Sequence, residues 1–431
     1  MSKATLIACR ECDLLQWKVS PPDGGRVGCH RCDAALYRSR TANHDRVLAL
    51  TVAAAILFVV ANLFPVVEVW VKGELMESTL AGAASALCTE GMWPIAGLVV
   101  LTTIVMPSVH MLAVIYLLLS MRFPLLFPTR RRALPLRPDI VLRLLQHVAP
   151  WGMIEVLMLA MLIALVKLQH VATVVPGVGL CSFGAVAVLL TATTAELDFR
   201  ELWVRLTRTR TSDSGPVAEK LRLRAQKTAA RAGVSACTDC GSLCAPFGSI
   251  PRPECQRCSN VLHVRKPRSL TRTWAFLIAA IVLYIPAVSL PVMVTQTLFR
   301  TQSDTILSGV VFLWTSGSWS LAAIVFIASI VVPMLKIFSL AFLAGSVQLR
   351  STLIPKQRTH IYRLLERIGR WSMLDIYVIT ILAALVQFGS IATINAGPGA
   401  IAFGAVVVLT MLATLSFDPR LIWDAVETKR G

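Results

Sequence analysis

Two pairs of Cys-x-x-Cys knuckles are the residues of this chain whose types and spacing most clearly indicate chemistry. The two knuckles of a pair are separated by 16 residues in one case and 14 in the other, so the chain can fold back and bring four thiolates to one ion. A four-thiolate tetrahedron favours zinc, and iron is the alternative that suits the same geometry. We therefore predict two metal sites, one formed by Cys9, Cys12, Cys29 and Cys32 and the other by Cys237, Cys240, Cys255 and Cys258.

Both predicted metal sites are expected to be structural. Four thiolates fill every position around a tetrahedral ion and leave none for a substrate or a water molecule. Disulfides are the alternative pairing, but a reducing cytosolic environment disfavours them. Cys244 lies inside the second spacer and, with four thiolates already present, is expected to be a bystander.

A second group of informative residues is ionisable and lies within apolar segments, where a charge costs at least ~2.5 kcal/mol and is usually paired or functional. Lys336 and Asp375 fall in the cytosolic halves of two predicted membrane helices, at depths that allow an ion pair. His110 and Glu155 occupy the matching positions earlier in the chain. An acid and a base therefore recur at the same two places, either to respond to cargo or to lock neighbouring helices together.

Other polar residues also lie within apolar segments. Lys167 and His170 stand three residues apart, so they share one side of a helix near its outer end, where snorkelling of the lysine is the alternative role. Ser329 and Thr410 could join a network with Lys336.

The segments that position these residues are present twice. The ribbon and the apolar block that follows it recur after 226 residues, and after 220 residues beyond a short deletion. This period is far longer than that of solenoid repeats. Matched residues include Trp93 and Trp319, Pro107 and Pro333, Gly177 and Gly397, Gly179 and Gly399, and the triplets Asp198, Arg200, Trp203 and Asp418, Arg420, Trp423.

The composition places these segments in a membrane. Hydrophobic residues form 55% of the chain, charged residues form 15%, and the mean hydropathy is +0.67, which is too apolar for a soluble globular protein. A helix needs about 20 apolar residues to cross the bilayer core. We predict an all-α polytopic membrane protein with eight transmembrane helices at residues 47–69, 92–120, 151–172, 179–198, 274–294, 318–346, 371–390 and 400–418. Pro65, Pro107, Pro291 and Pro333 are expected to kink or break four of them.

The formal net charge of +18 is distributed unevenly across the predicted membrane. Of 42 Lys and Arg residues, only Lys72 and Arg300 lie in the outer loops, and only Lys167 and Lys336 lie within the spans. All others fall on one side, as expected for a protein with both termini in the cytosol. Topology thus accounts for the charge without nucleic acid. The basic loops at residues 130–137 and 356–370 are expected to face solvent or anionic lipid.

An even number of spans gives the two halves the same orientation. The predicted architecture is therefore two parallel, pseudo-symmetric four-helix repeats, each preceded by a small cytosolic zinc-ribbon module. The expected boundaries are ribbon 1 at 1–45, transmembrane repeat 1 at 46–200, a cytosolic linker at 201–234, ribbon 2 at 235–268, transmembrane repeat 2 at 269–419 and a cytosolic tail at 420–431.

Several segments carry a resemblance to a known family. The ribbon and four-span order given twice, and the stretches at residues 304–309, 325–333 leading to Lys336, and 368–375, resemble the paraquat-inducible protein A family. Within that family the chain looks most like the lipophilic envelope-spanning tunnel A proteins. The resemblance covers nearly the whole chain.

This resemblance implies a multi-pass protein of the bacterial inner membrane with zinc in both ribbons. It also implies a periplasmic partner, a tunnel of mammalian-cell-entry domains through which phospholipids or other lipophilic molecules move between membranes. The intramembrane polar network of the family falls on Lys167, His170, Ser329, Lys336, Asp375 and Thr410. His170 stands where an aspartate is expected, so charge coupling in the first half would depend on a histidine, which can itself titrate.

We therefore expect an intermembrane lipid transport component rather than an enzyme, with the polar network as its switch. No P-loop motif is present in the sequence, so ATP is not expected to be its direct energy source. The alternatives are a proton-coupled secondary transporter of small solutes, a passive membrane anchor for the tunnel protein, and a membrane redox enzyme.

Overall fold

The computed structural model describes most of the chain. The described residues are 6–19, 25–38, 43–71, 74–89, 91–122, 138–168, 173–206, 228–244, 254–297, 300–317, 319–369, 377–378, 380–381 and 392–428. Within them the helices are α1 (His44–Leu63), α2 (Leu80–Thr89), α3 (Trp93–Val100), η1 (Leu101–Val105), α4 (Met106–Arg122), α5 (Pro138–Val148), η2 (Ala149–Trp151), α6 (Ile154–Leu168), α7 (Val178–Glu196), α8 (Phe199–Leu206), α10 (Ser269–Ser289), α11 (Ile306–Thr315), α12 (Trp319–Phe326), η4 (Ile327–Val331), α13 (Val332–Gln348), α14 (Pro355–Ile368), α16 (Pro398–Ser416) and α17 (Leu421–Thr428).

The strands are short and form five small antiparallel sheets in the described part of the chain. They are β1 (Leu6–Ala8), β2 (Leu15–Trp17), β3 (Arg26–Gly28), β4 (Ala35–Arg38), β5 (Val67–Val71), β6 (Glu74–Ser78), β7 (Thr173–Pro176), β8 (Ser235–Ala236), β9 (Leu243–Cys244), β10 (Met293–Thr297), β11 (Arg300–Asp304) and β12 (Ala392–Ala396).

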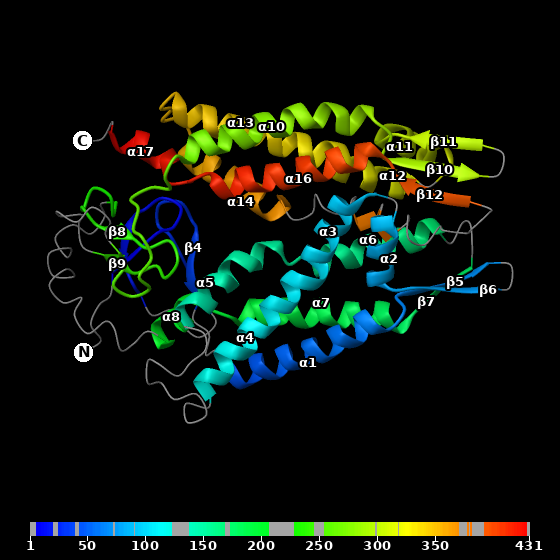
Figure 1. The fold of residues 1–431 in the computed structure, drawn as a ribbon. Helices are drawn as coiled ribbons and strands as arrows, with labels where there is room; N and C mark the ends of the chain where they lie inside the picture. The colour runs from blue at the N-terminus through cyan, green and yellow to red at the C-terminus, as the bar shows by residue number, and fades with distance from the viewer. Residues whose placement is uncertain are drawn as a thin grey trace.

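Two helical bundles lie side by side, one for each half of the chain (Figure 1). The bundle containing α1, α4 and α7 carries the sheet β6-β5-β7 at one end, and the bundle containing α10, α13 and α16 carries β11-β10-β12 at the same end. The cysteine-bearing hairpins gather at the opposite end of both bundles, together with α17 (Figure 1). The small sheets and the cysteine-bearing hairpins therefore lie at opposite ends of the long helices.

Seven helical segments among the described residues are long and apolar enough to cross a membrane. They correspond to seven of the eight predicted spans, so a mostly helical, multi-pass architecture is confirmed. The remaining predicted span, 371–390, lies outside the described residues except for 377–378 and 380–381.

The two three-stranded sheets correct the all-α prediction. α1 ends at Leu63, where the predicted span ran to residue 69, and residues 67–71 form the central strand of the first sheet. Pro65 lacks an amide hydrogen to continue the helix, and the apolar residues beyond it read equally well as strand or helix. The same happens after α10, where Pro291 precedes the central strand β10.

Glycines fasten the fourth long helix of each half to the end of the first. The Gly179 amide donates to the Pro65 carbonyl at 3.0 Å, and an added Cβ at Gly179 would lie 2.7 Å from that oxygen. In the second half the Gly399 amide donates to the Pro291 carbonyl at 3.0 Å, and a Cβ would lie 2.9 Å from it. Only a residue without a side chain permits this approach.

Pro107 and Pro333 are held within continuous helices rather than at breaks. Each follows a five-residue π-helical turn, η1 in the first half and η4 in the second, and the residues that flank both turns have α-helical backbone angles. A π turn adds a residue to the helix, which accommodates the missing proline amide without interrupting the span. The structure thus has a π-helical turn at the same place in each half, beside each of the two prolines.

One hydrophobic core joins the two bundles. It contains buried residues of α1, α3, α6 and α7 from the first half and of α10 and α16 from the second. Within it the Tyr377 hydroxyl donates to Thr102 Oγ1 at 2.8 Å, and Thr102 belongs to η1. The second half is therefore bonded directly to the widened turn of the first.

Candidate functional site

Four short knuckles carry the eight predicted metal ligands. In each knuckle the first cysteine amide donates to a carbonyl five residues ahead, and its own carbonyl accepts an amide four residues ahead. The residue after the second cysteine adopts a left-handed conformation, which closes the turn and points both thiols inward. These left-handed residues are Asp13 (φ 63°), Asp33 (φ 57°), Gly241 (φ 67°) and Ser259 (φ 56°).

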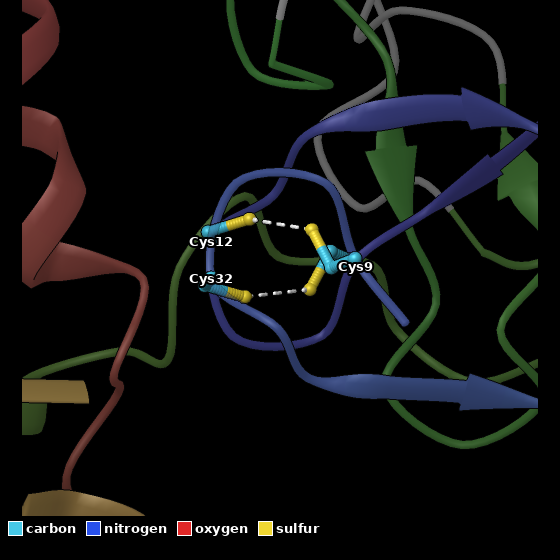
Figure 2. A group of neighbouring side chains, drawn as sticks. Cys9, Cys12 and Cys32 are labelled. Atoms are coloured by element: carbon cyan, nitrogen blue, oxygen red, sulfur yellow. Dashed lines mark hydrogen bonds between the residues drawn. The ribbon is translucent and has the colours of Figure 1, made fainter. Parts of the chain in front are cut away.

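The knuckles bring the sulfurs together as two clusters of four. In ribbon 1 the Sγ atoms of Cys9 and Cys32 lie 3.6 Å apart and those of Cys12 and Cys29 lie 3.5 Å apart. Figure 2 shows the Cys9, Cys12 and Cys32 thiols turned toward one point. Ribbon 2 repeats the arrangement, with 3.5 Å between Cys237 and Cys258 and between Cys240 and Cys255.

This geometry fits a tetrahedral ion. Zn–S bonds of about 2.3 Å place the sulfurs of a tetrahedron about 3.8 Å apart. All four ligand atoms of each cluster lie within 4.8 Å of one another and the residues are buried. The cysteines are free, so the disulfide alternative is not adopted. Two buried tetra-cysteine sites able to hold metal ions are therefore present, as predicted.

Hydrogen bonds within each cluster shift the pKa values of its thiols. Hydrogen bonds from neighbouring thiols, that of Cys12 foremost, hold the pKa of Cys29 far below its usual range. In ribbon 2 the corresponding residue Cys255 has a lowered pKa for the same reason, with Cys237 as the main donor. Gln16 Nε2 also donates to the Cys29 sulfur at 2.9 Å. A preformed thiolate is the form that binds a metal ion.

Cys244 was expected to be a bystander, but it contacts a cysteine of the second cluster. It is buried, and its Sγ donates to the Cys255 sulfur at 3.7 Å. A metal ligand that accepts a hydrogen bond is oriented by it, so Cys244 supports Cys255 from outside the four-sulfur set.

Lys336 is the most completely buried cation within the described membrane helices. Its side chain is 1% exposed, and its ammonium donates to the Gly369 carbonyl at 2.9 Å. That carbonyl stands directly beyond the end of α14, where the helix dipole is negative. The lysine is thus satisfied by a helix terminus, while its predicted partner Asp375 lies outside the described residues.

Ser329 and Thr410 are buried beside the bundle interior, as the predicted network requires. Both are 1% exposed, but each hydroxyl donates to a carbonyl of its own helix, Val325 in one case and Val407 in the other. Ser329 stands within the π-helical turn η4, and Lys336 lies one turn into the α13 helix that follows it. No hydrogen bond joins Ser329, Thr410 and Lys336 directly in the described part of the structure.

The first-half candidates are arranged differently. His110 is buried on α4, whereas Glu155 is exposed on α6 and accepts a hydrogen bond from Thr191 Oγ1 at 2.6 Å. His110 and Glu155 form no ion pair within the residues described. Lys167 is the penultimate residue of α6 and His170 lies outside the described residues, so their participation in a network stays a prediction.

Two basic residues of the second middle loop do not face solvent or lipid as expected. Arg358 is 3% exposed and donates to the Ser351 carbonyl at 2.7 Å. Arg363 pairs with Glu11 of ribbon 1, with 2.6 Å between Nε and Oε2. Charge counting could not separate these arginines from solvated ones, because partners distant in sequence decide their environment.

The duplicated Asp-x-Arg-x-x-Trp triplets carry a role that register alone did not reveal. Asp418 accepts from the Arg420 amide and guanidinium and starts α17, which places Trp423 in the core beneath ribbon 1. In the first half Trp203 is buried in the core that contains the ribbon 2 cysteines. The triplet therefore seats a tryptophan under each ribbon.

Long apolar helices with two tetra-cysteine modules at one end define a multi-pass membrane protein with paired metal-binding modules. The paraquat-inducible protein A family matches the chain twice, at residues 44–207 and 270–427. The chain belongs to this family, which confirms the resemblance seen in the sequence.

Curated relatives match almost the full length of the chain. Intermembrane transport protein PqiA of Escherichia coli (strain K12) is 32% identical over 97% of this chain and 95% of its own length. Lipophilic envelope-spanning tunnel protein A of the same strain is 31% identical over 97% of this chain and 91% of its own. A probable intermembrane transport protein of Haemophilus influenzae is 27% identical over 99% and 97%. These identities do not separate the two named types. No solved structure matches the chain.

Proposed function

We propose that the protein is an inner-membrane component of an intermembrane lipid transport system. It passes phospholipids or other lipophilic molecules to or from a periplasmic tunnel of mammalian-cell-entry domains. The observation that carries this proposal is the nearly full-length similarity to relatives named for intermembrane transport and for an envelope-spanning tunnel. A multi-pass chain without a P-loop motif suits a membrane subunit that works with a partner.

In this proposal the chain crosses the membrane eight times, as two parallel pseudo-symmetric repeats with the predicted boundaries and both termini in the cytosol. α14 ends near the ribbons, whereas β12 pairs with β10 at the opposite end of the bundle. The eighth crossing is the predicted span at residues 371–390, whose 20 residues are long enough to cross the bilayer core as a helix. The duplicated sheets and π turns support the repeat.

The ribbons hold one zinc ion each and serve as structural modules of the cytosolic face. Zinc would supply tetrahedral cross-linking of two knuckles and no redox chemistry. The polar network of Lys167, His170, Ser329, Lys336, Asp375 and Thr410 is the switch, with His110 and Glu155 as first-half equivalents. Burial of Lys336 supports this assignment, because a cation held in hydrocarbon is costly unless it serves a purpose.

The test compares two variants. Lys336→Met removes the buried lysine, and Lys356→Met, at an exposed position of α14, is the matched control. Purified protein is reconstituted with its periplasmic partner, and transfer of a fluorescent phospholipid to acceptor vesicles is measured. We expect Lys336→Met to slow transfer about tenfold or more while the control transfers normally. Zinc content, thermal unfolding and partner binding are measured alongside, and unchanged transfer by a folded Lys336→Met variant would falsify the switch.

A passive anchor for the tunnel protein is the second candidate. The bond from Lys336 to the Gly369 carbonyl favours it, because a satisfied lysine can simply lock α13 to the end of α14. An anchor would keep binding its partner with every buried charge replaced. A proton-coupled solute transporter would instead show proton-linked uptake in liposomes without the partner.

A further inference from the structure

The two ribbons dock on the bundles of the opposite halves. Ribbon 1 precedes the first bundle in sequence, yet its four cysteines share a hydrophobic core with Ile337 of α13, Tyr362 of α14 and Trp423 of α17. Ribbon 2 precedes the second bundle, yet its cysteines share a core with Leu142 of α5 and Trp203 of α8. The connections between module and bundle therefore cross.

The crossed docking uses the same pair of contacts on both sides. Arg363 of α14 donates to the carbonyl of Cys32, the last cysteine of ribbon 1, at 2.5 Å, and pairs with Glu11 between its first two cysteines. Arg143, at the matching position of α5, donates to the carbonyl of Cys258, the last cysteine of ribbon 2. It also pairs with Asp239, between the first two cysteines of that ribbon, at 3.5 Å.

Each arginine thus connects the two knuckles of one ribbon. The carbonyl it binds belongs to a metal-ligating position, and the carboxylate stands between two such positions. In each ribbon one guanidinium contacts both knuckles at once. Burial raises the pKa of Glu11, and the Arg363 guanidinium offsets part of that effect.

Helix α14 connects Arg363 to the carbonyl that binds the buried Lys336. Arg363 lies six residues before Gly369 on α14, a rigid helix along which that separation is about 9 Å. Gly369 provides the carbonyl that binds the Lys336 ammonium. α14 is further fixed by Trp423 Nε1, which donates to Thr359 Oγ1 at 3.0 Å.

We propose that each ribbon braces the amphipathic helix of the opposite half, and that ribbon 1, through Arg363, sets the position of the carbonyl that holds Lys336. Arg363 and Arg143 are positioning residues. Ribbon 1 thereby stabilises the second bundle and ribbon 2 stabilises the first, although in sequence each ribbon precedes the other bundle. The brace itself is independent of the cargo, and its importance for transport rests on the proposed function of Lys336.

The experiment measures hydrogen exchange by mass spectrometry on the full chain in lipid nanodiscs. Arg363→Leu is expected to speed exchange in α14 roughly tenfold, a factor equal to about 1.4 kcal/mol, and to leave α5 unchanged. Arg143→Leu is expected to do the reverse and serves as the matched control. Faster exchange in α5 on Arg363→Leu, or an unchanged α14, would overturn the proposal.

Two further variants distinguish the brace from a general loss of folding. Arg363→Lys keeps the charge but cannot make both contacts, so a smaller change is expected in the same helix. Glu11→Arg combined with Arg363→Glu should restore part of the slow exchange, because the ion pair returns while the bond to the Cys32 carbonyl does not. Exchange as fast as in Arg363→Leu, at normal zinc content, would overturn the role of the pair. Hydrogen exchange is measured without lipid transfer, so it tests the brace independently of the proposed transport function. If transfer by Lys336→Met is normal, only the link from brace to transport is lost.

Discussion

Individual polar residues in this protein are satisfied mainly by the backbone. Lys336 binds the Gly369 carbonyl, and Ser329 and Thr410 bind carbonyls of their own helices. The sequence placed these residues within apolar segments expected to cross a bilayer, and the structure finds all three buried. It could not reveal their partners, since a carbonyl carries no sequence signal. Cysteine spacing is such a signal, so both clusters were predicted. Arg143 has no distinguishing pattern around it, and its contact with the Cys258 carbonyl was not predicted.

At the residue scale, the bond from Tyr377 to Thr102 is expected to help hold the two halves together. Tyr377→Phe removes one buried hydrogen bond and should cost about 0.5–1.5 kcal/mol. Thr102 Oγ1 still donates to the Leu98 carbonyl, so no polar group is left unpaired. Thermal unfolding in detergent measures the loss. Tyr284→Phe, at a partly buried tyrosine in α10, is the control, and an equal loss in both variants would contradict the assignment.

Among the elements, those defined by long apolar runs were predictable, but their outer ends were not. The spans at 47–69 and 274–294 were predicted too long because strands β5 and β10 continue the apolar pattern beyond a proline. These segments form strands because they pair with β7 and β12, which lie 95 or more residues away along the chain. Local periodicity cannot report such a partner. The glycine register did point to the place, since Gly177 and Gly397 mark where α7 and α16 meet those strands.

At the element scale, Gly179→Ala is expected to destabilise the first bundle by about 1–3 kcal/mol. The new methyl group would lie 2.7 Å from the Phe64 and Pro65 carbonyl oxygens, so α7 has to move away from the end of α1. Gly97→Ala in α3 is the matched control, because nothing lies within 4 Å of its added Cβ and alanine favours the helix. Thermal unfolding should therefore shift down for the first and stay level or rise for the second. A similar shift in both would show that the close approach is unimportant.

On the scale of the whole molecule, the ribbons are docked on the rest of the chain rather than attached to it as loose domains. Ion pairs from Arg265 to Asp13 and Asp424, at 2.9 and 2.6 Å, connect the end of ribbon 2 to ribbon 1 and to α17. Domain boundaries drawn along the sequence therefore say little about which parts move together. A linear reading assigns each ribbon to the bundle that follows it, and only three-dimensional contacts reveal the crossed arrangement.

At the scale of the whole molecule, metal content tests whether both ribbons bind zinc. Elemental analysis of the purified chain should give two zinc ions, and Cys32→Ser should give one and lower the unfolding temperature, since metal binding contributes to the stability of the fold. Cys88→Ser, at an exposed thiol outside both clusters, should keep two ions and the original temperature. Iron in place of zinc, or one ion in the unmodified chain, would contradict the proposed cofactor.

The crossed docking also orders the biogenesis of the protein. Ribbon 1 is synthesised long before α17, on which its contacts with Trp423 and Glu427 depend. The module therefore stays only partly covered until α17 has been made. Removing the last turn of α17 would leave the long apolar helix α16 intact and still remove the ion pair of Glu427 with Arg31 of the ribbon.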